Sequence, residues 1–550
     1  MRQNALRLMR AAGAVREAMA SAGPKVAEAG LSTRAAIGST RALASLSRST
    51  KQAAPFSIAL ANAMQQASIS SSAQARMALA EVPVDGDLQK VLAEIDAIVS
   101  AESCTAKEVA DAAVALAYMQ AKGDRRIWGK VFEKAGAVKG SFDAASLTAF
   151  MWAATTAGVS HFKTIAEMSG PAAALLGSMT PAQVSTVVEA LGKAGCKDAE
   201  LFGKVGAAVT AGASKYSGAE LARTLWGFAA AGAADGAMAK AVSAALVAKA
   251  GELSGREAVQ AVWALAKMRR TDKPALDALV KAAKAKLGSI ESPIDVAALA
   301  WSLGFLSYKL DSSTASALSG TLAKGASELS PAHAIDAAWG LGVLGVNDAA
   351  ATKALLDVAA SAIAANPNAV HVYQAGALHN AAVMLGGKLP EQVSAFALKM
   401  YSLGGAAMAV KTSAAGTAFK ADLAAATAYA FGARYRPEIA AAVKGFAVTT
   451  PEGISVCIAL ESGGAKVAVE AVHPCNTSAT HPGVALGPAV ARAKLLEAAG
   501  YKVVPVSMTE WAAQGDDKTK AAAVLKAAKA AGVNVSAAEA ALAKPFDAYA

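Results

Sequence analysis

A tryptophan recurs in the middle of this chain at intervals that are multiples of 37 or 38 residues. Five of the seven tryptophans share one position in a repeating alanine-rich segment, and Val114 and Glu189 hold the same position in two further segments. We call this position the slot of each repeat. A period of this length is typical of a helical hairpin, which buries its apolar side by stacking on its neighbours. The seven slots are Val114, Trp152, Glu189, Trp226, Trp263, Trp301 and Trp339.

Helix-capping residues follow the same period. Nine residues before each slot stands a Ser, Thr or Asp, whose side chain can accept a hydrogen bond from a free N–H of the first helical turn. Four of the Ser or Thr caps have Glu or Gln three residues later, which completes a capping box. Each repeat is therefore predicted to be a capped helix carrying the slot, a short turn and a second helix. The predicted caps are Thr105, Asp143, Thr180, Ser217, Ser254, Ser292 and Ser330.

Small residues lie three positions after each slot tryptophan, on the same helical face. This spacing predicts that the large ring packs in the core over small neighbours and keys one helix into the next. The alternative is that the rings are exposed platforms on which bases stack. The small residues are Thr155, Ala229, Ala266, Gly304 and Gly342.

The net charge of +11 is concentrated at the N-terminus, where residues 1–51 carry nine Lys or Arg and two Glu. This segment is also rich in Ala and Ser, which is typical of an organellar transit peptide. We expect the mitochondrial matrix as the location, with the chloroplast stroma as the alternative. A basic arm that remains on the protein would have the same composition.

The remaining composition favours an all-helical core. Hydrophobic residues make up 54% of the chain and aromatic residues only 5%, so the core must consist of small, closely packed side chains. No apolar run is long enough to span a bilayer. The four cysteines have no paired spacing, which predicts reduced thiols in an intracellular or organellar protein.

The periodicity changes near the C-terminus. Residues 454–460 and 466–472 are β-rich and are joined by the turn sequence ESGG. Residues 488–499 predict a helix that ends at Gly500, and residues 501–508 predict a third strand. The order strand, strand, helix, strand indicates a small α/β domain.

These features together resemble a known family. Segments such as "AVWALAKM" (261–268) resemble octotricopeptide repeats, which are helical RNA-binding repeats of algal organelles. Residues 455–474 and 487–511 resemble the RAP domain that often follows such repeats. The resemblance implies a mainly α fold, an α-solenoid of 37–38-residue hairpins, followed by a ββαβ domain of the restriction-endonuclease-like class.

The RAP-like segment departs from its family where a nuclease would need metal ligands. The family commonly has a glutamate, an apolar residue and an aspartate on its second strand. Here Glu470 is present, but Val472 stands at the aspartate position. One carboxylate does not make a divalent-metal site. We therefore expect a degenerate RAP domain with no catalytic residues, no metal and no enzymatic activity.

The predicted boundaries follow from these patterns. Residues 1–51 form the targeting segment or arm, and residues 52–102 an N-terminal helical cap. The repeat array, with an eighth irregular repeat, covers residues 103–390. An irregular helical cap (391–450), the RAP-like domain (451–515) and a helical tail (516–550) complete the chain.

Three motifs resemble ligand sites but lack the required context. "GLGVLG" (340–345) matches a dinucleotide-binding pattern but falls inside a repeat helix rather than after a strand. "GAAMAVKTS" (405–413) has Val410 in place of the second glycine of a phosphate-binding loop. His473, Cys475 and His481 do not have zinc-ligand spacing. We therefore expect no cofactor and no small-molecule substrate.

Two basic clusters, 122–139 and 267–286, lie at turns and second helices of the array. Lys and Arg neutralise phosphates and so provide most of the sequence-independent affinity for RNA. The alternative is that they only solvate helix faces. With two further residues of the RAP-like helix, the candidate RNA-binding residues are Lys122, Arg125, Arg126, Lys130, Lys134, Lys267, Arg269, Arg270, Lys273, Lys281, Lys284, Lys286, Arg492 and Lys494.

The sequence thus predicts an organellar RNA-binding protein. Outside residues 1–51 the net charge is only +4, which favours a structural component of the mitochondrial ribosome, bound to ribosomal RNA and to neighbouring ribosomal proteins. One alternative is a free factor that stabilises, processes or activates translation of one messenger RNA. An alternative of another class is a scaffold subunit of a different mitochondrial complex. Helical arrays elsewhere read about one base per repeat, so seven or eight repeats predict about seven or eight nucleotides.

Overall fold

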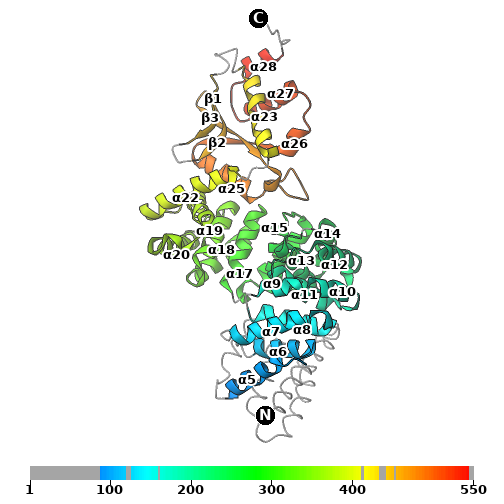
Figure 1. Cartoon of the computed structure of the whole chain (residues 1–550). Helices are drawn as coiled ribbons and strands as arrows, with labels where there is room; N and C mark the ends of the chain where they lie inside the picture. The colour runs from blue at the N-terminus through cyan, green and yellow to red at the C-terminus, as the bar shows by residue number, and fades with distance from the viewer. Residues whose placement is uncertain are drawn as a thin grey trace. The chain divides into compact units, whose positions relative to one another are not determined.

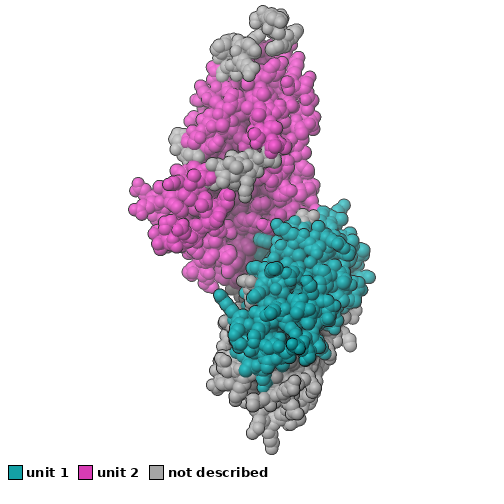
Figure 2. All heavy atoms as spheres, viewed as in Figure 1, with its two compact units in different colours: residues 1–264 teal, residues 265–550 magenta. Residues whose placement is uncertain are grey.

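A computed structural model of the chain describes residues 87–118, 125–158, 161–233, 235–290, 292–410, 414–432, 441–450 and 454–543. The predicted targeting segment and residues 52–86 of the predicted cap lie outside them. The described chain is mainly helical with a small sheet near its C-terminus, as predicted, but the sheet has four strands where the sequence predicted three (Figure 1). It divides into two compact units, residues 1–264 and 265–550 (Figure 2).

Unit 1 consists of helical hairpins whose first helix carries the slot. The first helices are α6 (Ala106–Tyr118), α8 (Ala144–Thr156), α11 (Pro181–Lys193) and α13 (Gly218–Ala231). The second helices are α7 (Arg125–Ala137), the broken pair α9 (Phe162–Glu167) and α10 (Ser169–Leu175), α12 (Ala199–Gly212) and α14 (Gly236–Lys249). First helices pack on first helices and second helices on second helices, which gives two rows. Helix α5 (Asp87–Ser100) packs on α6 and α7, and α15 (Gly255–Lys267) crosses the boundary of the units.

The predicted caps explain where the first helices begin. Thr180 and Ser217 form capping boxes with Gln183 and Glu220. Thr105 and Ser254 exchange the same pair of hydrogen bonds with the glutamates three residues later. Asp143 and Ser330 also cap their helices. Ser292 is the exception, because its side chain makes no cap hydrogen bond.

Adjacent first helices approach so closely that their backbones touch. A Cβ atom built on Gly192 of α11 would lie 2.5 Å from the carbonyl oxygen of Gly227 of α13. In unit 2, a Cβ on Gly304 would lie 2.7 Å from the Cα of Gly340. Contacts this short exclude any side chain. The same contact between successive helices therefore recurs in both units.

Unit 2 begins with further hairpins of the same kind. Its first helices are α17 (Pro293–Phe305), α19 (Pro331–Leu344) and α21 (Val372–Leu385). Its second helices are α16 (Lys273–Ala285), α18 (Ser312–Gly325), α20 (Ala349–Ala365) and α22 (Glu391–Val410). Helices α17, α19 and α21 pack in sequence, and α16, α18, α20 and α22 form the second row.

The C-terminal part of unit 2 contains the sheet. Strands β2 (Ser455–Ser462), β3 (Ala465–Val472) and β4 (Tyr501–Ser507) and helix α25 (Gly487–Ala498) match the predicted elements. Gly463 and Gly464 both have positive φ, as the tight turn between β2 and β3 requires. The sheet order is β1-β2-β3-β4, with β4 parallel to β3 and the other pairs antiparallel.

The sequence did not predict strand β1 (Val443–Thr449), and the structure moves one boundary. Residues 391–450 were assigned to a cap of the array, but β1 belongs to the sheet, and α23 (Ala414–Ala430) packs on α27 (Asp517–Ala530) and β3. The predicted tail also contributes to this core, because Val524 and Leu525 of α27 are buried in it. The remaining helices are α26 (Met508–Ala512) and α28 (Ser536–Leu542).

The sheet has a hydrophobic core on each face. On one face, Ile458 and Val467 pack with buried residues of α23 and α27. On the other face, Ala468 packs with Leu495 and Leu496 of α25. Helix α25 in turn contacts α17, α19 and α21, so it lies between the sheet and the first helices of unit 2 (Figure 1).

Candidate nucleic-acid interface

The predicted RNA-binding residues fall into three groups, one in unit 1 and two in unit 2. Lys122 lies outside the described residues. One group lies on α7 in unit 1. A second lies on the last turns of α15, the turn after it and α16, and a third consists of two residues of α25.

The cations of the α7 group bind α5 and the turn that follows α5. Arg126 and Lys130 both pair with Asp96, at 3.0 and 2.8 Å. The hydrogen bond from Lys130 lowers the pKa of the Asp96 carboxyl. Lys134 donates to the carbonyl oxygens of residues 101 and 102 at 2.8 and 3.0 Å. Arg125 is exposed at the start of the helix.

Arg269 takes part in contacts with the C-terminal segment of unit 2. It lies six residues after its slot, where several repeats have a left-handed glycine such as Gly232, and it has φ 56° itself. Its guanidinium donates to the Pro474 carbonyl at 2.6 Å, and its own carbonyl accepts from the Ala479 N–H at 2.8 Å. Thr271 adds hydrogen bonds to Ser478, Thr480 and His481, at 2.7 to 3.3 Å.

Three of the six other cations in the second group pair with acids. Arg270 is buried and makes two hydrogen bonds to Asp272, and Lys273 pairs with Asp277 at 2.6 Å. The Lys273 hydrogen bond lowers the pKa of Asp277. Lys284 pairs with Asp311 at 3.2 Å. Lys267 and Lys281 are exposed, and Lys286 is half-buried.

The two α25 cations make contacts inside unit 2. Arg492 Nε lies 2.7 Å from Glu470, whose side chain is 6% exposed, and Arg492 also donates to the Ser455 carbonyl. Burial alone would lower the pKa of Arg492, but the Glu470 carboxylate more than offsets it, and the pKa is raised. Lys494 donates to the carbonyls of Gly342 and Val343 on α19, at 2.8 and 2.9 Å.

The slot tryptophans are less buried than the core-packing prediction requires. Trp339 is buried, with 8% exposure, but the other four are only half-buried. Trp226 and Trp263 stack on each other, with ring centroids 5.7 Å apart and an interplanar angle of 26°. Trp301 stacks instead on Phe305 of its own helix, at 5.1 Å.

The half-buried rings of unit 1 belong to a stripe along its first helices. In each first helix from α8 onward, the stripe comprises the slot residue, the residues seven and three positions before it, and the residue four positions after it. Positions that fall outside unit 1 are left out. At these spacings the side chains share one helical face. Every residue of the stripe is half-buried or exposed. We call this set the unit 1 stripe: Ala145, Ala149, Trp152 and Thr156 on α8; Ala182, Thr186, Glu189 and Lys193 on α11; Ala219, Arg223, Trp226 and Ala230 on α13; and Arg256, Gln260 and Trp263 on α15.

Charged and aromatic groups of the unit 1 stripe contact one another from helix to helix. Glu189 pairs with Lys193 of its own helix at 3.0 Å and with Arg223 of the next helix at 3.3 Å. The Lys193 ammonium also lies 5.9 Å from the centroid of Trp226, at cation–π distance. Two cations thus share one carboxylate, and the side chains of Lys193 and Arg223 remain 38% and 35% exposed.

Lys193, Arg223 and Arg256 were not predicted as binding residues from the sequence. The prediction selected dense basic clusters, which lie mainly on second helices and turns. The signal that would have found the missed residues is their fixed offset from the slot: four after it for Lys193, three before it for Arg223 and seven before it for Arg256. Cations at such offsets repeat along one face although they are far apart in the sequence.

The three motifs that resemble ligand sites have structural explanations. Gly340 of the "GLGVLG" motif lies in α19, where a Cβ atom would be 2.4 Å from the Ala300 carbonyl of α17. Residues 405–410 of the second motif are the last turns of α22, and residues 411–413 lie outside the described chain. His473 accepts a hydrogen bond from the Cys475 N–H, and His481 bonds Thr271. Within the described residues, no three His, Cys, Asp or Glu side chains are grouped as metal ligands.

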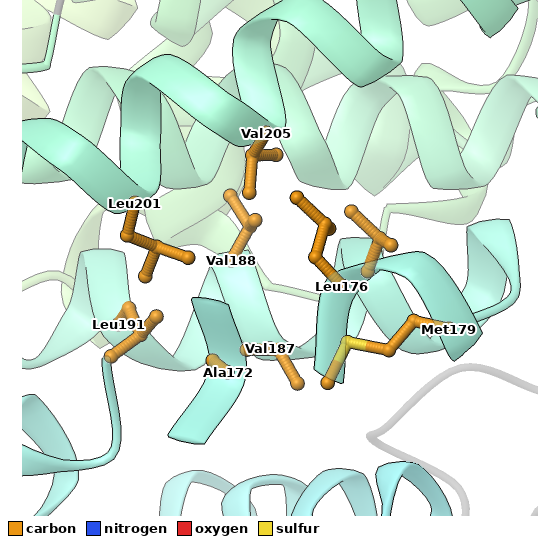
Figure 3. Close-up of a pocket in the computed structure, with 9 residues that line it drawn as sticks. Ala172, Leu176, Met179, Val187, Val188, Leu191, Leu201 and Val205 are labelled. Carbon is orange, nitrogen blue, oxygen red and sulfur yellow. The ribbon is translucent and has the colours of Figure 1, made fainter. Parts of the chain in front are cut away.

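A small apolar pocket lies among α10, α11 and α12 (Figure 3). Its empty volume is about 210 Å³, part of which is open to solvent. The lining has no charged or polar side chain that could orient a ligand, so we assign it to imperfect packing beside the broken helix pair α9 and α10. The lining residues are Ala172, Leu176, Met179, Val184, Val187, Val188, Leu191, Leu201 and Val205.

None of the described helices has the combination of length and apolar character that crossing a bilayer requires. Neither a protein-family model nor a curated protein matches this sequence. The arrangement of side chains in the two units therefore carries the functional argument.

Proposed function

We propose that this chain is an organellar helical-repeat protein, built as a solenoid of 37–38-residue hairpins, that binds single-stranded RNA without chemically altering it. The observation that supports the proposal is the unit 1 stripe, where Lys193, Arg223 and Arg256 accompany the half-buried rings of Trp226 and Trp263. Cations attract the phosphate backbone, and aromatic rings contact bases of any sequence.

The C-terminal domain is proposed to be a degenerate RAP-like domain with a structural role. Its one carboxylate at the family's acidic positions, Glu470, accepts hydrogen bonds from Arg492 and from the Cys457 N–H. These contacts use the carboxylate oxygens to hold strands and helix together. Arg492 and Lys494, which we expected to contact RNA, support this structural role instead.

RNA binding is tested with the purified full-length chain and a fluorescently labelled oligouridine, by anisotropy over a range of salt concentrations. Neutralisation of three phosphates on a single strand predicts a slope of log affinity against log salt of about −2. Trp263→Ala removes a ring contact worth about 1–3 kcal/mol, so affinity should fall about 5- to 150-fold.

Arg223→Met should weaken binding and make the salt slope shallower by about 0.7. The matched control is Lys204→Met on the second helix α12, where the lysine is 52% exposed and paired with Glu200. If Trp263→Ala and Arg223→Met both bind RNA as tightly as the unchanged protein, the unit 1 stripe is not the binding surface.

The cellular setting that we favour is the mitochondrial ribosome, with ribosomal RNA and neighbouring ribosomal proteins as partners. Sedimentation of organelle lysate distinguishes the alternatives. Comigration with a ribosomal subunit supports this role, and a light RNase-sensitive particle supports a free messenger-RNA factor. A large RNase-resistant complex supports a protein scaffold.

A further inference from the structure

The first helices of unit 2 carry a different set of side chains at the stripe positions. Neither α17 nor α19 has a Lys or Arg there, and Asp336 is the only charged residue at these positions of the two helices; Lys267, four residues after Trp263, holds the last stripe position of α15 at the start of unit 2. The other members are apolar or small. The unit 2 stripe consists of Ile294, Ala298, Trp301 and Phe305 on α17, and Ala332, Asp336, Trp339 and Val343 on α19.

Helix α25 of the C-terminal domain lies against this stripe. A Cβ atom on Gly487, the first residue of α25, would lie 2.5 Å from the Gly304 carbonyl oxygen and 2.8 Å from the Trp339 ring. The α25 backbone is therefore in direct contact with α17 and α19. A base cannot enter between surfaces at this distance, and the contact explains why Trp339 is the most buried slot tryptophan.

Two further contacts fix α25 in this place. The Lys494 ammonium binds the carbonyls of Gly342 and Val343, at the end of α19 where the helix dipole is negative. Burial lowers the pKa of Lys494, as expected for a lysine that reaches into the protein. At the other edge, the hydrogen bonds of Arg269 and Thr271 hold the segment that leads into α25.

We propose that α25 is the permanent occupant of the unit 2 stripe and that RNA is confined to the unit 1 stripe. This inference rests on the RNA-binding function proposed above. In unit 1 the slot of α6, Val114, is buried, which leaves the four slots Trp152, Glu189, Trp226 and Trp263. At one base per repeat, the footprint is about four nucleotides rather than the seven or eight that the repeat count predicts.

The footprint is measured on the full-length chain with labelled oligouridines of increasing length. Affinity should rise steeply up to four or five nucleotides and then change only slightly, as extra binding registers become available. A steep rise that continues to seven or eight nucleotides would overturn the inference but leave RNA binding intact. Absence of binding at every length would overturn the proposed function itself, and the footprint with it.

A second variant tests whether the occupancy is permanent. Gly487→Leu should force α25 away from Trp339, which limited proteolysis would detect as faster cleavage of the C-terminal domain. The control is Gly483→Leu, because a Cβ there meets only Glu510 at an ordinary 3.5 Å. The plateau should stay at four or five nucleotides in both variants, since the uncovered stripe has no cations. Extension of the plateau to seven or eight nucleotides in Gly487→Leu would show a removable cover over an RNA path and refute permanent occupancy.

Discussion

The two units are built from the same helical hairpin but carry different side chains at the stripe positions. Helix caps, glycine contacts and left-handed turns recur in both, because these residues face the neighbouring helix or close the hairpin. The stripe positions differ: three residues before the slot, α13 of unit 1 has Arg223, whereas α17 and α19 of unit 2 have Ala298 and Asp336. The difference indicates that the cap, glycine and turn positions determine the fold, whereas the stripe positions determine what can cover the exposed face of the first helices.

The largest expected effect is a difference in stability cost between breaking an ion pair in unit 2 and breaking one in unit 1. Arg492→Met leaves the buried Glu470 carboxylate without its cation, which should lower the free energy of unfolding by about 4 kcal/mol. Arg223→Met breaks a half-exposed pair with Glu189 and should cost less than about 1 kcal/mol. Urea denaturation followed by circular dichroism measures both.

The two variants should have the opposite ranking in RNA binding. Arg492→Met, assayed where it is still folded, should bind oligouridine normally, and Arg223→Met should bind it weakly. Adding Glu470→Gln to Arg492→Met should restore part of the lost stability, since the unpaired charge is then removed. Equal stability costs for Arg492→Met and Arg223→Met would refute the assigned difference between the pairs.

The next prediction tests the backbone contact between successive first helices, which both units share. Gly227→Ala in unit 1 and Gly340→Ala in unit 2 would each place a Cβ within 2.6 Å of a carbonyl oxygen on the preceding first helix. The helices must separate, at a net cost of up to about 3 kcal/mol in each unit. Gly203→Ala on α12 is the control: nothing lies within 4 Å of its Cβ, so the better helix propensity of alanine should stabilise it by up to about 1 kcal/mol.

The thermal unfolding midpoints of these three variants decide the comparison. The midpoints of Gly227→Ala and Gly340→Ala should fall by similar amounts, and the midpoint of the control should rise. If Gly227→Ala behaves like Gly203→Ala, the first helices of unit 1 are not in backbone contact, and the shared architecture is wrong for that unit.

Local features of the fold were predictable from the sequence. Cap residues such as Ser217 and the turn at Gly463 act within a few residues, so their spacing alone specifies a helix start and a hairpin. Strand β1 was not predicted for two reasons. Gly445 and the left-handed Ala447 interrupt the alternation of apolar and polar residues that marks a strand. The strand is instead specified by its hydrogen bonds to β2, which the local sequence does not reveal.

The site was less predictable than the fold, because charge density does not show which cations are already paired. Lys134 and Lys494 resemble phosphate ligands in the sequence, but their ammonium groups bind backbone carbonyls that are 32 or more residues away. Arg223 lies outside the basic clusters of the sequence, so charge density did not identify it. Its place beside Trp226 and Glu189 depends on the packing of successive first helices, which only the three-dimensional arrangement provides.

The smallest effect concerns the acidic residue of the unit 2 stripe. Burial raises the pKa of Asp336 from 3.8 to about 6. The folded state therefore binds this proton more tightly than the unfolded state, and stability contributed by the neutral acid is lost as pH rises from about 4 to 6. Asp336→Asn should be more stable than the unchanged protein by about 2 kcal/mol at pH 7 to 8, after allowance for partial exposure.

The pH dependence distinguishes this effect from a general gain in stability. Well below pH 3.8 the aspartic acid is neutral in both states, so the advantage of Asp336→Asn should disappear there. The control Asp357→Asn, at a 58% exposed position on α20, should show only a small difference across the range. An advantage of Asp336→Asn that persists unchanged well below pH 3.8 would show that desolvation of this carboxylate is not its cause. The contrast with Arg223, which occupies the equivalent position in unit 1 and has a 35% exposed side chain, would then need another explanation.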